Sequence, residues 1–129
     1  MGSVKYFEEL ITWKKARQLT KEIYDASNQG PFAGDFGLRN QIRRASVSIV
    51  SNIAEGFERG WTTEFMQFLS MAKGSTGEVK TQLYIAFTQG YLDQGAFDRL
   101  TTLTVETGQL IGGLIRYLQK TQIRGSKYH

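Results

Sequence analysis

The sequence has 129 residues, of which 40% are hydrophobic, and it carries 16 Lys and Arg against 12 Asp and Glu, a net charge of +4. It has no cysteine, which excludes disulfides and thiolate metal sites, and its single histidine is the last residue, His129. No apolar run reaches the roughly 18 to 20 residues that cross a bilayer, and the N-terminus lacks a signal-peptide pattern. These features predict one cytoplasmic domain over residues 1–129, without a metal, a cofactor or a membrane segment, and the basic balance favours anionic partners such as nucleic acid.

The first half of the chain contains two stretches with helical periodicity. Residues 11–28 place Leu19 and Ile23 on one side of a predicted helix. Pro31, the only proline of the sequence, follows this stretch and marks a break. A second helix is predicted over residues 36–58. Its apolar residues recur at steps of three and four: Leu38, Ile42, Ala45, Ile49 and Ile53.

The second half contains two further predicted helices, each with a residue that can cap its start. Thr62 can cap a helix over residues 62–89, and Asp93 can cap another over residues 94–121. No sustained alternation of apolar and polar residues indicates a strand. Four amphipathic helices with short connections predict an all-α fold, namely an antiparallel up-down-up-down four-helix bundle.

The predicted helix over 36–58 carries more apolar surface than one bundle core requires. A second strip lies roughly 140° from the core stripe, at the 100° per residue of an α-helix. This strip consists of Val47, Val50, Ala54 and Phe57. In the last helix, Gly108 and Gly112 fall on one side, and interior glycines indicate a closely packed neighbour. We expect both features to form an oligomer interface; the alternative is that the strip lies under the 29–37 connection.

One motif of the second predicted helix resembles a known family. Residues 41–49 read Gln-Ile-Arg-Arg-Ala-Ser-Val-Ser-Ile, and residues 51–56 read Ser-Asn-Ile-Ala-Glu-Gly. This wording is similar to the signature of the 23S ribosomal RNA intervening-sequence protein family, whose members were first noticed as reading frames inside bacterial 23S ribosomal RNA genes. The likeness extends over nearly the whole chain. The family commonly has proline where this chain has Val50, so a straighter helix is expected here.

The resemblance implies a four-helix bundle that assembles into a ring-like homopentamer. It implies no established molecular function, and nucleic-acid binding is the usual proposal for the family. A similar pentameric bundle acts as the accessory protein of retroelements and binds a reverse transcriptase. A protein-interaction adaptor is therefore the alternative to a nucleic-acid-binding protein.

Basic residues supply the candidate nucleic-acid-binding surface. In the expected bundle, the start of the first helix, the turn near Gly60 and the end of the last helix share one end. That end collects Lys14, Lys15, Arg17, Lys21, Arg59, Arg116, Lys120, Arg124 and Lys127. Such a surface would bind phosphates with little sequence specificity, and a plain solvated surface is the alternative. Trp13, Tyr24 and Tyr117 are candidates for base stacking, although aromatic residues at the edge of an apolar stripe usually belong to the core.

The opposite end of the expected bundle carries Arg39, Arg43 and Arg44. We expect Glu78 to form an ion pair with Arg43 or Arg44, and RNA contact is the alternative. Asn52, Glu55 and Gly56 are prominent in the motif. However, Glu55 has no histidine and no clustered carboxylate near it in the sequence, so no catalytic residue is predicted and the protein is not expected to be an enzyme.

Overall fold

The fold is all-α, as the periodicity predicts. It is given by a computed structural model that describes the backbone of residues 4–127 and the side chains of residues 4–122. No strand occurs within this range. The elements are η1 (Phe7–Glu9), α1 (Ile11–Ser27), α2 (Gly30–Gly34), α3 (Phe36–Phe57), α4 (Thr63–Thr88) and α5 (Gln94–Lys127).

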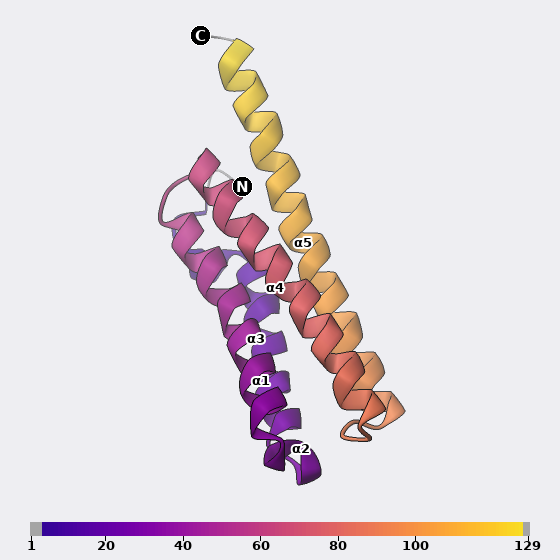
Figure 1. Ribbon diagram of the computed structural model, residues 1–129. Coiled ribbons are helices and arrows are strands. Elements are labelled where there is room, and N and C mark those ends of the chain that lie inside the picture. The colour runs from indigo at the N-terminus through magenta and orange to yellow at the C-terminus, as the bar shows by residue number, and fades with distance from the viewer. Residues whose placement is uncertain (1–3, 128–129) are drawn as a thin grey trace.

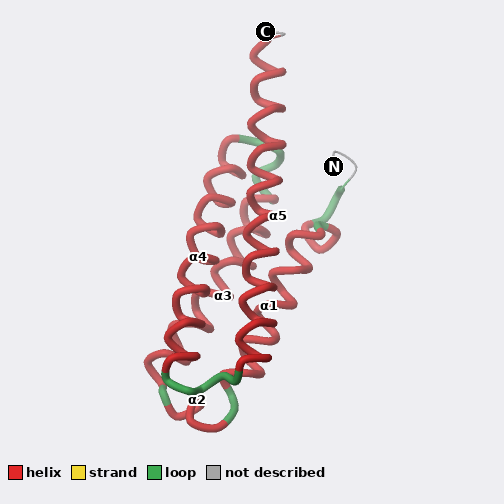
Figure 2. The backbone as a smooth tube through the Cα atoms, turned by 90° about the vertical axis from the view of Figure 1, so that its right-hand side faces the viewer, coloured by secondary structure: helices red, strands yellow, loops and turns green. Residues whose placement is uncertain are grey.

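The four long helices contact one another in a cycle. α1 packs against α3, α3 against α4, α4 against α5, and α5 against α1. The long helices run alongside one another, and the last turns of α5 extend past the other helices (Figure 1). The start of α1 and the end of α5 lie at the same end of the molecule as the α3–α4 turn, in both views (Figures 1 and 2).

The apolar stripes of these helices meet in a single buried cluster. Side chains without any exposed surface come from all four long helices: Leu19, Ile42, Ile49, Ile53, Phe65, Leu69, Leu83, Ile111 and Leu118. Burial of each such side chain stabilises the fold by about 1.5–3 kcal/mol, before the cost of ordering it. Within residues 4–127, no helix is both long enough and apolar enough to pass through a lipid bilayer.

Side-chain caps fix where three of the helices begin. The Oγ1 atom of Thr62 accepts a hydrogen bond from the amide of Phe65 at 3.3 Å, and Asp93 Oδ1 accepts from the amide of Ala96 at 2.8 Å. Both predicted caps are therefore confirmed. Asp35 is a third cap, which the sequence reading missed: its Oδ1 accepts from the amide of Leu38 at 3.1 Å.

Two short elements were not predicted. α2 begins at Gly30, whose φ of +53° requires glycine-like freedom, and Pro31 follows in its first turn. The region expected as a plain connection therefore holds a short helix, which buries Phe32. η1 is a single 3-10 turn ahead of α1. α5 runs to Lys127 rather than to residue 121.

The motif glycine of α3 marks a close contact with α4. A Cβ atom on Gly56 would lie 2.7 Å from Phe68 Cβ and 2.8 Å from Phe65 Cδ1. Contacts this short are sterically forbidden, so only glycine fits at this position. α3 continues without interruption past Val50, where the resembling family commonly has proline.

Candidate functional site

Most of the predicted basic residues lie at one end of the molecule, and several of them are already paired with carboxylates. The prediction is wrong for Lys21, because its neighbour Glu22 pairs with Arg99 near the start of α5, at the opposite end. Lys15 Nζ lies 3.6 Å from Glu106 Oε2, and Lys21 Nζ lies 2.7 Å from Asp25 Oδ2. Arg59 lies between two acids, 3.7 Å from Glu55 and 3.5 Å from Glu64. These exposed pairs contribute little stability, yet each one offsets a positive charge that a polyanion would otherwise meet.

Other cations at this end have no carboxylate within 4.0 Å among the described side chains: Lys14, Arg17, Arg116 and Lys120. The Arg17 guanidinium lies over the Trp13 ring, 5.6 Å from its centroid. The residues whose side chains are not described, 1–3 and 123–129, include no Asp or Glu. Arg124 and Lys127 belong to α5, but their side chains lie outside the described range.

The predicted stacking residues pack against other aromatic rings or under cations. Trp13 is half-buried and meets Phe7 edge-on at 5.3 Å between ring centroids. Tyr117 meets Trp61 edge-on at 6.0 Å, and Trp61 also packs on Phe57 and Phe65. Both tryptophans therefore belong to aromatic clusters at the same end of the molecule as the predicted basic surface.

The structure adds two basic residues that the sequence reading missed. Lys73 and Lys80 of α4 line a groove between α4 and α5 with Arg116, and the groove has a volume of about 330 Å³. No acidic residue lines it. The missed signal is the seven-residue spacing of the two lysines, which places them on one side of α4. Finding their partner on α5 also requires the register of the two helices.

The glycines expected at an oligomer interface belong to this same groove. A Cβ atom on Gly112 would lie 3.3 Å from Arg116 Nη1 and 3.5 Å from Lys73 Nζ, and one on Gly108 would lie 3.3 Å from Thr76 Oγ1. The neighbours of these glycines are thus side chains of the same chain. Their role between subunits stays a prediction.

At the opposite end, the expected ion pair of Arg43 or Arg44 with Glu78 is wrong. Arg43 points to α1, where its Nε donates to Ser27 Oγ at 2.8 Å and its guanidinium covers the Tyr24 ring at 4.7 Å. The reason is that Arg43 lies on the side of α3 that faces α1, whereas Glu78 belongs to α4. Arg44 and Glu78 line one groove without an N–O contact within 4.0 Å.

Arg39 is also held by its own neighbourhood. Its Nη1 donates to the carbonyl oxygen of Ala33 at 3.0 Å, and its guanidinium lies 4.8 Å from the centroid of the Phe36 ring. Of the three arginines at this end, only Arg44 makes no hydrogen bond or ion pair within the described residues.

The predicted second strip of α3 is partly buried within the chain. Val50 and Phe57 pack against the core, whereas Val47 keeps 40% of its surface exposed. The alternative, burial under the 29–37 segment, does not apply to Phe57, because Phe57 packs on Trp61 at the other end of α3. The exposed part of the strip, Val47, lies one turn after Arg43, whose guanidinium covers the ring of Tyr24 on α1.

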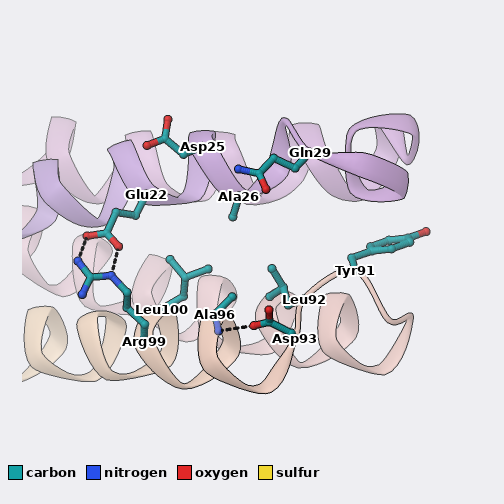
Figure 3. Close-up of a pocket in the computed structure, with 10 residues that line it drawn as sticks. All are labelled: Glu22, Asp25, Ala26, Gln29, Tyr91, Leu92, Asp93, Ala96, Arg99 and Leu100. Atoms are coloured by element: carbon teal, nitrogen blue, oxygen red, sulfur yellow. Dashed lines mark hydrogen bonds and ion pairs between the residues drawn. The ribbon is translucent and has the colours of Figure 1, made fainter.

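A second groove lies between α1 and the start of α5 and has a volume of about 290 Å³ (Figure 3). Arg99 donates from Nε and Nη2 to the two carboxylate oxygens of Glu22, the latter at 2.7 Å. This bidentate pair raises the pKa of Arg99, mainly through the hydrogen bond to Glu22 and also through its charge. Because both oxygens of Glu22 accept from a permanently charged group, the pair does not form a proton-transfer couple. It ties α1 to α5.

The motif residues of α3 make structural contacts. Asn52 donates to the carbonyl oxygen of Ser48 at 2.9 Å, and Glu55 pairs with Arg59 one turn further on. Ser75 of α4 donates to Ser48 Oγ at 3.1 Å, which links the two helices. Among the described residues, no three His, Cys, Asp or Glu side chains are grouped so that they could hold a metal ion.

Comparison with known proteins identifies a family and solved structures of similar fold. The sequence profile of a family described as 23S rRNA-intervening sequence protein matches residues 8–113. A crystal structure of a protein with unknown function, from the S23 ribosomal protein family of Bacteroides thetaiotaomicron, is similar in fold. Its TM-score is 0.74 at 19% identity, with 81% of this chain and 98% of that chain covered. No curated protein matches the chain.

Proposed function

Because the chain belongs to the 23S rRNA-intervening sequence protein family, we propose that it is a non-enzymatic, cytoplasmic nucleic-acid-binding protein. In this proposal it folds as an antiparallel four-helix bundle and assembles with copies of itself. Its target is most readily RNA, bound through phosphates with little sequence preference. A pentamer is the assembly that the resemblance implies.

The observation that carries this proposal is the surplus of unneutralised positive charge at one end of the molecule. Lys14, Arg17 and Lys120 have no described carboxylate within 4.0 Å. Lys14 and Arg17 belong to the first half of α1 and Lys120 to the last third of α5. The start of α1 and the end of α5 lie at the same end of the molecule (Figure 2). A surface of this kind binds a polyanion by releasing its counterions, and copies of the chain in one assembly would multiply it.

The proposal predicts salt-dependent binding of a single-stranded RNA. We expect fluorescence anisotropy with a labelled oligonucleotide to show an affinity that falls steeply as the salt concentration rises. Replacing Lys14 or Lys120 by Gln should each flatten the slope of log K against log salt by about 0.7, the value for one phosphate contact on a single strand. Gln29→Glu lowers the net charge by the same amount at the opposite end of the molecule, just before α2, and serves as the matched control (Figure 1). Absence of salt-sensitive binding to RNA or DNA would reject the proposal.

One observation favours a second candidate, a protein-interaction adaptor. Val47 and Tyr24 each keep 40% of their surface exposed on the α1–α3 side, where a partner protein could bury them. In this case the assembly would ignore RNA. It would instead form a stoichiometric complex with the product of a neighbouring gene, such as a reverse transcriptase, when the two proteins are co-expressed.

A further inference from the structure

We infer that the groove between α4 and α5 is a phosphate-binding site in which Lys73 and Arg116 hold one phosphodiester group of a nucleic-acid strand. This inference rests on the proposed function and adds its site. The carrying observation is that two cations from different helices meet over one glycine. Nζ of Lys73 and Nη1 of Arg116 each lie within 3.5 Å of the point that a Cβ on Gly112 would occupy.

This arrangement is electrostatically unfavourable in the free protein. Since both nitrogens approach the same point, they lie within about 7 Å of each other, where like charges repel. No described carboxylate comes within 4.0 Å of either residue, and the residues outside the description contain no Asp or Glu. The side chains of the same molecule therefore leave this pair of charges without a neutralising partner.

The neighbouring polar groups do not neutralise the pair either. The hydroxyl of Thr76 donates to the carbonyl oxygen of Lys73 at 2.6 Å, and that of Thr104 donates to the carbonyl oxygen of Leu100 at 2.7 Å. Gly112 has no side chain, so the ends of Lys73 and Arg116 approach each other over it, beside a groove of about 330 Å³ that can hold an anion. A phosphate group offers two oxygens to two donors and supplies the missing negative charge.

The groove is longer than one phosphate. Lys80 follows Lys73 after seven residues, about 10 Å further along the same side of α4. Tyr84 lies one turn beyond Lys80, outside the groove lining, and its ring packs edge-on against Phe97 at 5.0 Å between ring centroids. It keeps 53% of its surface exposed, which offers a ring for base stacking. A line of two cations and an aromatic ring fits a strand better than a free nucleotide, so we assign the site to a nucleic-acid backbone.

A double-mutant cycle tests this assignment. Lys73→Gln, Arg116→Gln and the double variant are titrated into a labelled single-stranded RNA by fluorescence anisotropy, with Gln29→Glu as the control of equal change in charge. Each single change should weaken binding about fivefold more than the control does, as expected for a charge-assisted hydrogen bond. The double variant should lose less than the product of the two single losses, because both residues hold one phosphate.

Gly112→Ala tests the same site without changing any charge. The added methyl group meets only the flexible ends of Arg116 and Lys73, so the helix should keep its thermal stability while RNA affinity falls. AMP tests whether the groove holds a free nucleotide instead of a strand. We expect that AMP does not displace the labelled RNA, even at concentrations that would saturate a mononucleotide site.

The outcomes separate this inference from the proposed function. If Lys14→Gln and Lys120→Gln weaken RNA binding but the groove variants match Gln29→Glu, the groove assignment is overturned and the proposed function stands. Competition by AMP, or a lower assembly mass for the groove variants in light scattering, also overturns the assignment, because the groove would then hold a nucleotide or a second copy of the chain. If the wild-type protein binds no nucleic acid, both proposals fail together.

Discussion

At the scale of single residues, the sequence predicts where helices begin better than it predicts the direction in which a side chain points from its helix. It predicted the caps Thr62 and Asp93, because a capping residue is defined by its local position. It paired Glu78 with Arg43 or Arg44 from their heights along the bundle, whereas the structure turns Arg43 toward Ser27 on α1. A pairing across helices depends on which face each helix presents to which neighbour, and periodicity alone does not give that.

Gly56 is the glycine at which an added Cβ atom would make the shortest contacts. We expect Gly56→Ala to lower the free energy of unfolding by about 1–3 kcal/mol, because its methyl group would collide with Phe65 and Phe68, which cannot both move away. Gly74→Ala is the matched control, since nothing lies within 4 Å of its Cβ position, and it should raise stability by up to about 1 kcal/mol. Urea unfolding monitored by circular dichroism measures both, and equal effects of the two changes would contradict this account.

At the scale of elements, the long helices were predictable and the short ones were not. α1, α3 and α4 begin and end within one residue of the ranges expected from periodicity. η1 and α2 have too few residues to show a period, and α2 depends on a positive φ at Gly30. The α4–α5 groove was missed for a related reason: its cations come from two helices whose mutual register only the folded chain defines.

One hydrogen bond joins the segment between α2 and α3 to the turn between α4 and α5. Tyr91 donates its hydroxyl hydrogen to Asp35 Oδ2 at 2.9 Å, while Asp35 Oδ1 caps α3. This hydrogen bond is the main reason that the pKa of Tyr91 is raised above 10.0, with smaller contributions from burial and from the charge of Asp35. A single carboxylate therefore stabilises one helix start and one distant turn.

This hydrogen bond should make stability depend on alkaline pH. A raised pKa in the folded state means that the contribution of Tyr91 is complete below pH 10.0 and is lost as the pH rises through the folded-state pKa. We expect Tyr91→Phe to be less stable than the wild type at about pH 8, with a difference that shrinks above about pH 10. Thermal unfolding of both proteins across this range measures it. A difference that stays constant with pH would show that the hydroxyl proton is not involved.

At the scale of the whole molecule, the exposed apolar residues are the candidates for the proposed contact between subunits. The sequence predicted a second apolar strip on α3, and the structure buries part of it within the chain. What remains exposed of this strip is Val47, and Tyr24 of α1, whose ring lies under Arg43, is exposed to the same extent. Val47 lies outside the buried core, so a substitution there can test the proposed contact between subunits without unfolding the chain.

We expect Val47→Glu to lower the mass of the assembly in size-exclusion chromatography with light scattering, while the helical circular dichroism signal is kept. The reason is that a charge placed in an apolar subunit contact is costly to bury. Ile85→Glu on α4 is the control, because Ile85 is similarly exposed at 44% but lies on a different side of the molecule. If Ile85→Glu dissociates the assembly and Val47→Glu does not, the contact lies on α4 instead.

The position of the two aromatic clusters determines which part of the molecule its intrinsic tryptophan fluorescence monitors. The sequence has two tryptophans, and both Trp13 and Trp61 lie at the end where the predicted basic surface gathers. Intrinsic fluorescence is therefore a local signal. A strand that docks at this end should quench it without any attached dye, whereas loosening of the distant turn that carries Tyr91 would leave it unchanged. Emission and helical ellipticity, recorded on one sample, thus distinguish an event at the charged end from one at the opposite end.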